Sequence, residues 1–72
     1  MTILEFKNRL RQAGYTLVPN SSSYGYREYS KEDVFVSIFS PEGYGWPVIR
    51  RAGRPEERFA TYEGAWNAIK DV

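Results

Sequence analysis

The stretch DVFVSIFS, residues 33–40, is the densest apolar, β-branched and aromatic run in the chain. Turn-forming sequences lie on both sides of it, SKED before and SPEG after, and this pattern predicts a β-strand. Successive side chains of a strand point to opposite faces, so Val34, Val36 and Ile38 share one face and the two phenylalanines lie on the other. Apolar side chains on both faces predict the central strand of a small sheet, with helices packed on one face.

The first helix is predicted at residues 3–13. Thr2 and Glu5 have the spacing of a capping box, in which each side chain accepts a hydrogen bond from the backbone N–H of the other residue. Apolar residues then recur at steps of three and four, which is typical of an amphipathic helix: Ile3, Phe6, Leu10 and Ala13. Gly14 follows as a residue suited to the left-handed conformation past a helix end.

Other segments also have strand character. Residues 15–18 form a short run that ends at Pro19, and residues 24–29 contain three tyrosines and are expected to form a hairpin with the central strand. Residues 44–51 follow a predicted type I turn that contains Pro41. Pro47 has no backbone N–H to donate, so it predicts that this strand lies at an edge of the sheet, at least near its start.

The last helix is predicted to begin after Thr61, and residues 57–60 before it are a candidate for a short fourth strand. Its apolar stripe consists of Tyr62, Ala65 or Trp66, Ile69 and Val72. The element order α-β-β-β-α predicts one small α+β domain over residues 1–72, with a three-stranded antiparallel sheet and two helices on one face. We expect the helices to pack on the central strand through Phe6, Leu10, Trp66 and Ile69.

Composition excludes several kinds of chemistry. The 72 residues include no histidine and no cysteine, so disulfides, thiolate metal sites and histidine-activated nucleophiles are not available. We therefore expect no enzymatic activity, no catalytic residue, no cofactor and no metal. No apolar run approaches the ~20 residues of a membrane span and no signal peptide is present, so we expect a cytoplasmic protein with no membrane partner. The net charge of +1 does not demand a nucleic-acid partner.

The element order resembles that of the double-stranded-RNA-binding domain. In that family the second helix opens with a basic segment that contacts phosphates, whereas residues 59–64 here read FATYEG, with an acid and no lysine. The segment LRQAGYTLV, residues 10–18, is similar to the opening of the mRNA-cleaving toxins of hic-type toxin–antitoxin pairs. Their catalytic histidine is absent here, so this resemblance implies a catalytically inactive toxin-like protein.

A third resemblance covers the second half of the chain. The segments WPVIRR at residues 46–51 and FATYEGAW at residues 59–66 are similar to the ending of small DNA-binding modules, such as the AP2-like, arm-type domains of phage integrases. There the sheet enters the major groove. The three resemblances together suggest an accessory protein of a phage or mobile element.

The candidate partner-binding surface combines aromatic residues with arginines, which are enriched at binding hot spots. Its members are Tyr44, Trp46, Arg50, Arg51 and Arg54, with Lys7 and Arg11 of the first helix as a second basic surface. The sequence favours a non-enzymatic module that binds a protein stoichiometrically, as a phage-type inhibitor such as an anti-CRISPR does, with a host nucleoprotein complex among the candidate targets. The alternative is a nucleic-acid-binding module, and both a monomer and a homodimer are compatible with the sequence.

Overall fold

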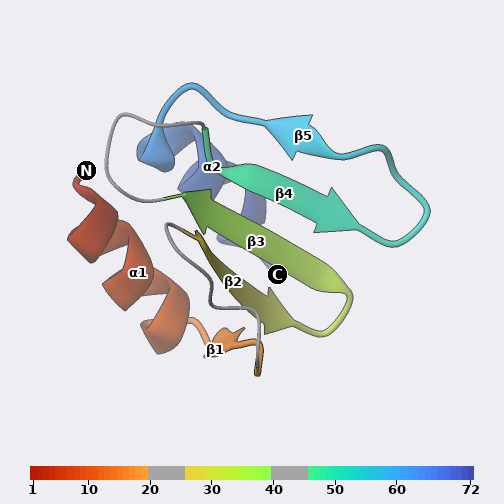
Figure 1. Ribbon diagram of the computed structural model, residues 1–72, viewed down its shortest axis with the longest axis horizontal. Coiled ribbons are helices and arrows are strands. Elements are labelled where there is room, and N and C mark those ends of the chain that lie inside the picture. Colours follow the sequence, from red (N-terminus) through yellow and green to blue (C-terminus); the bar gives the residue numbers. More distant parts are fainter. Residues whose placement is uncertain (20–25, 40–45) are drawn as a thin grey trace.

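The computed structural model describes residues 1–19, 26–39 and 46–72. In these residues, two helices and five strands follow one another (Figure 1): α1 (Ile3–Gln12), β1 (Thr16–Leu17), β2 (Tyr26–Lys31), β3 (Val34–Phe39), β4 (Val48–Arg51), β5 (Glu57–Arg58) and α2 (Tyr62–Ile69). The strands form one antiparallel sheet in the order β1-β2-β3-β4-β5. The α+β class is confirmed, and β3 is the central strand. The predicted three-stranded sheet is not exact: the candidate fourth strand at residues 57–60 is present as β5, and the strand-like residues 15–18 supply β1, so the sheet has five strands.

Both helices begin as their capping residues predict. The Thr2 hydroxyl accepts a hydrogen bond from the Glu5 N–H at 3.1 Å, and the Glu5 carboxylate accepts one from the Thr2 N–H at 2.9 Å. At the other end of α1, Gly14 has a φ of +96°, a conformation that glycine adopts without steric cost. Thr61 caps α2 by accepting a hydrogen bond from the Gly64 N–H at 2.9 Å.

The core lies between the helices and one face of the sheet. Phe6 and Leu10 of α1 and Ile69 of α2 are buried against Val34, Val36 and Ile38, as predicted. Trp66 also packs against this core, but it is only partly buried, whereas its neighbour Ala65 is fully buried. The Trp66 ring contacts the guanidinium of Arg9 as well, which lies 5.9 Å from the ring centroid.

The prediction of an edge position for the strand after Pro47 is wrong. β4 is paired on both sides, with β3 through Ile49 and Val36 and with β5 through Ile49 and Glu57. Pro47 precedes β4, and its carbonyl still accepts a hydrogen bond from the Phe59 N–H at 3.0 Å. The missing proline N–H therefore removes one bond at the end of the ladder and does not prevent β5 from pairing.

Two cations on the helix-covered face hold the ends of the helices. Lys31 donates to the backbone oxygens of Ala13 at 2.7 Å and Val72 at 2.8 Å, and Arg51 donates to the Ala68 carbonyl at 2.5 Å. The last carbonyls of a helix have no partner within the helix and form the negative end of its dipole. Lys31 and Arg51 lie on either side of Val34 in the ladder, so this row of the sheet stabilises both helix C-termini.

Candidate functional site

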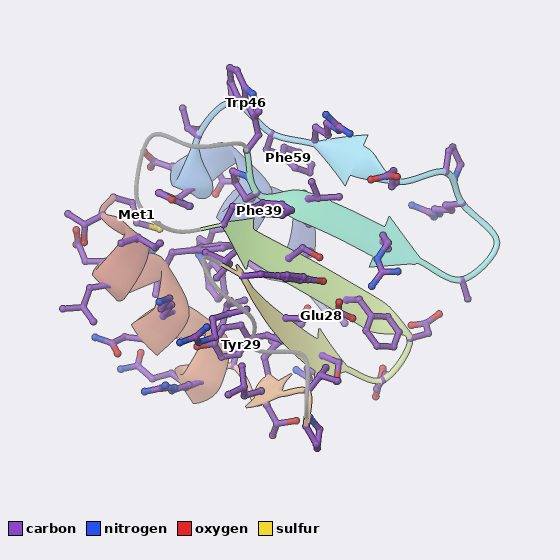
Figure 2. The ribbon with its side chains drawn as sticks, in the orientation of Figure 1. Met1, Glu28, Tyr29, Phe39, Trp46 and Phe59 are labelled. Atoms are coloured by element: carbon purple, nitrogen blue, oxygen red, sulfur yellow. The ribbon has the colours of Figure 1, made fainter. Side chains whose placement is uncertain are left out.

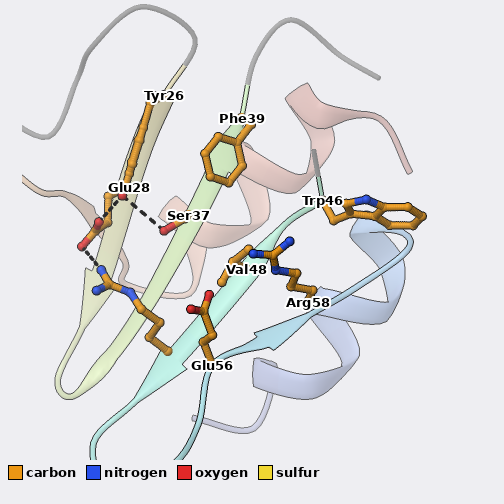
Figure 3. Close-up of a pocket in the computed structure, with 9 residues that line it drawn as sticks. Tyr26, Glu28, Ser37, Phe39, Trp46, Val48, Glu56 and Arg58 are labelled. Atoms are coloured by element: carbon orange, nitrogen blue, oxygen red, sulfur yellow. Dashed lines mark hydrogen bonds and ion pairs between the residues drawn. The ribbon is translucent and has the colours of Figure 1, made fainter. Parts of the chain in front are cut away.

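One face of the sheet is not covered by the helices, and we call it the open face. Figure 3 looks onto it and shows both helices behind the strands. The pairing of neighbouring strands places alternate residues on this side. The open face includes Tyr26, Glu28, Ser30, Phe35, Ser37, Phe39, Val48, Arg50 and Arg58.

A hollow of about 460 Å³ lies across β2, β3, β4 and β5 on the open face (Figure 3). Seven open-face residues line it, together with Trp46 and Glu56. Trp46 and Phe39 are large apolar residues that remain 51% and 37% exposed, and Figure 2 shows both at the same end of the sheet. The Phe39 ring meets the Tyr26 ring edge to face, with centroids 5.4 Å apart. The volume lies within the ~300–1,000 Å³ that ligand pockets typically have.

A polar network forms one side of the hollow. The Tyr26 hydroxyl donates to one oxygen of the Glu28 carboxylate, and Arg50 donates to the other oxygen at 2.8 Å. Tyr26 also lies 3.3 Å from the Ser37 hydroxyl, which is buried. The Arg50 guanidinium lies 5.5 Å from the Phe35 ring centroid. The negative charge of Glu28 is thus paired with the positive charge of Arg50. The Arg50 side chain lies along the sheet surface, over Phe35.

The network has a consequence for alkaline stability. Burial raises the pKa of Tyr26 above its ordinary value of 10.0, and the hydrogen bond to Glu28 acts in the same direction. Burial also raises the pKa of Tyr15, in the core. The unfolded chain therefore releases these protons at lower pH than the folded chain, so the free energy of unfolding should fall as the pH rises through 10.

Absorbance titration of the tyrosines and denaturant melts on either side of pH 10 measure this effect. We expect part of the tyrosine absorbance change to occur above the ordinary range, with Tyr26→Phe removing its share. Six tyrosines that all titrate normally, with stability unchanged above pH 10, would contradict the burial described for Tyr15 and Tyr26.

The arginines of the predicted cluster do not lie on one surface of the structure. Arg50 lies on the open face, whereas Arg51 points to the opposite face and bonds to α2. Arg54 is exposed in the turn between β4 and β5. Lys7 and Arg11 belong to α1, which covers the other side of the sheet. Tyr44 lies outside the described residues, so its predicted place on the surface stays untested.

Sequence reasoning missed most of the residues around the hollow. Glu28, Ser37, Val48 and Glu56 were not candidates, although strand alternation alone assigns Val48 and Arg50 to one face of β4. The tyrosines of residues 24–29 also differ in position, because Tyr29 is buried in the core while Tyr26 lies on the open face. The position of each residue relative to the neighbouring strands depends on register, which local sequence did not provide.

No protein-family model, curated protein or solved structure matches the chain, so the three family resemblances stay predictions. In residues 1–19, 26–39 and 46–72, no helix has the length and apolarity to cross a membrane. The same residues contain no cluster of three or more potential metal ligands among aspartate, glutamate, histidine and cysteine.

Proposed function

We propose that the chain is a non-enzymatic binding module that docks a protein partner on the open face, around the hollow. The observation that supports this most is the exposure of Trp46 and Phe39 beside a concave surface. Tryptophan is among the residues most enriched at binding hot spots. Hot-spot residues contribute to affinity when the partner buries them in a well-packed part of the interface that excludes water. Burial of both rings by a partner would remove apolar surface from water and supply the main favourable term.

The charges around the hollow favour a protein over a nucleic acid. Arg50 and Arg58 are the two cations that line it, and Glu28 and Glu56 are the two anions. Affinity for nucleic acid rests on excess positive charge that neutralises phosphates, and this surface has no such excess. Arg50 is also paired with Glu28, while Arg51 is bonded to α2.

The residues of the hollow also support a stoichiometric rather than a catalytic role. The chain has no histidine or cysteine, and the Ser37 hydroxyl lies beside a tyrosine and not beside a base. Glu28 is engaged by a tyrosine and an arginine. The network therefore provides a rigid polar wall beside the aromatic residues and not an activated nucleophile.

Capture of a partner by matched variants tests the proposal. Wild type, Trp46→Ala and Leu4→Ala are immobilised and exposed to nuclease-treated lysate of the cells that encode the chain. Leu4 is a matched control because it is an apolar residue, 64% exposed, on α1 and away from the open face. We expect wild type and Leu4→Ala to retain one protein in equimolar amount, and Trp46→Ala to lose on the order of 1 kcal/mol or more of affinity. Equal retention by all three variants would contradict the proposal.

Titration with nucleic acid tests the alternative. Labelled single- and double-stranded RNA and DNA are added to wild type and Arg50→Ala at two salt concentrations, with and without divalent metal. We expect no cleavage and no saturable binding at moderate salt. Tight binding whose salt slope falls by about one unit in Arg50→Ala would instead identify the open face as a nucleic-acid surface.

A further inference from the structure

The second surface of interest is the outer edge of β5. β5 is the last strand of the sheet, and no strand among the described residues pairs with its outer side, as Figure 1 shows at the top of the view. Glu57 and Arg58 are both exposed. An edge strand leaves backbone N–H and C=O groups that can pair with another chain, so the orientation of these groups decides what can bind.

The bonding pattern shows which residues present these groups. Phe59 donates its N–H to the carbonyl of Pro47, the residue just before β4, at 3.0 Å. In an antiparallel ladder such bonded positions alternate along the strand, so Glu57 and Phe59 direct their backbone groups toward β4. Glu56 and Arg58 therefore direct theirs toward the outer edge. Pro55 has the same parity as Glu57, so its missing N–H removes no donor from that edge.

The side chains of Glu56 and Arg58 are complementary to each other but not paired with each other. Both line the hollow, so they lie on the same side of the strand, as Figure 3 shows. The ion pair between Arg50 and Glu28 involves neither of them. If the same strand of a second copy is placed antiparallel beside this one, the acid of each strand can lie opposite the base of the other.

We infer that a second copy of this chain binds to this edge, with its β5 antiparallel and a two-fold axis at Glu57. Glu56 of one copy then lies opposite Arg58 of the other, and the reverse pair forms at the same time, as an isologous contact requires. These are also the residues whose backbone groups point outward, so each pair exchanges backbone hydrogen bonds. The two sheets become continuous, and the two hollows lie next to each other on one surface.

The contact predicts a weak dimer. A pair of two-residue strands buries much less than the ~1,200–2,000 Å² of a standard interface, so association depends on concentration. Glu57 is on the opposite side of the strand, at the register position of Ile49, and faces its own copy across the axis. Like charges in directly opposite positions destabilise strand pairing, so Glu57 opposes the dimer.

Charge exchange tests this register by sedimentation equilibrium across a concentration series. Arg58→Glu alone and Glu56→Arg alone should each weaken association by about tenfold, because both cross-strand pairs become repulsive. The double variant Glu56→Arg/Arg58→Glu should return to within about threefold of wild type, and Glu57→Gln should tighten association by about two- to threefold. Lys70→Glu, at the exposed end of α2, controls for the change in net charge.

Circular dichroism establishes that each variant is folded, and rescue by the double variant cannot arise from misfolding. A wild type that stays monomeric at all concentrations, or a double variant no better than the single ones, would overturn the inference. This inference does not rest on the proposed partner, since sedimentation uses the chain alone. Loss of the dimer with capture intact overturns the edge contact only, whereas Trp46-independent capture overturns the proposed function only.

Discussion

We expect Ile38→Ala to leave most of the chain unfolded under conditions where wild type is folded. Ile38 is a residue of β3 that is 1% exposed and packs in the core with residues of both helices. Truncation of a buried isoleucine typically costs about 2–5 kcal/mol, through lost burial and the cavity left behind. A domain of this size has little more stability than that in total. Leu10→Ala, on α1, should have a similar effect.

Thermal melts followed by circular dichroism measure this prediction. Leu4→Ala is the control, because it removes a similar side chain from the exposed side of α1 and should melt close to wild type. If Ile38→Ala melts at the wild-type temperature, then the helices do not pack on this face of the sheet.

The second large effect concerns the adjacent residues Arg50 and Arg51, whose substitutions should lower the free energy of unfolding by different amounts. Arg51→Met removes the donor that bonds the Ala68 carbonyl near the end of α2. A hydrogen bond to a charged group contributes about 1.5–3 kcal/mol, so we expect Arg51→Met to lower the free energy of unfolding by about 1–3 kcal/mol. Arg50→Met loses a partly exposed ion pair with Glu28, which is worth about 0–1 kcal/mol.

Denaturant unfolding of the two variants compares these energies directly, because both substitutions remove one guanidinium from the same strand. A larger loss for Arg50→Met than for Arg51→Met would show that the side chains are exchanged between the two faces, and that β4 is out of register by one residue.

Local sequence patterns predicted the elements that depend on local chemistry. The capping residues Thr2 and Thr61 mark the helix starts, and the alternation within residues 34–39 separates core from open face. The edge position predicted from Pro47 was wrong because the prediction considered only the missing N–H of the proline. Its carbonyl accepts a hydrogen bond from Phe59 and so takes part in pairing. The segments that supply β1 and β5 were recognised as strand candidates, but both strands are only two residues long, too short for a periodic pattern to show that they join the sheet.

The candidate site depends on contacts between distant segments. Arg50 reaches Glu28, 22 positions earlier, across the central strand, and the hollow combines residues from four strands. Pairing register determines these contacts, and no local feature of residues 26–31 or 48–51 specifies it. Strand alternation did contain the information that Arg50 and Arg51 point apart, so that part of the site was predictable.

The footprint of the captured partner tests the central claim most directly. Backbone amide chemical shifts of the labelled chain are recorded with and without the partner, after correction for any self-association. We predict that the largest changes fall on the open face, at Phe39, Val48 and Arg50, and at Trp46 beside it. Changes confined to α1 around Lys7 and Arg11, with the open face unaffected, would contradict the claim that this face binds the partner.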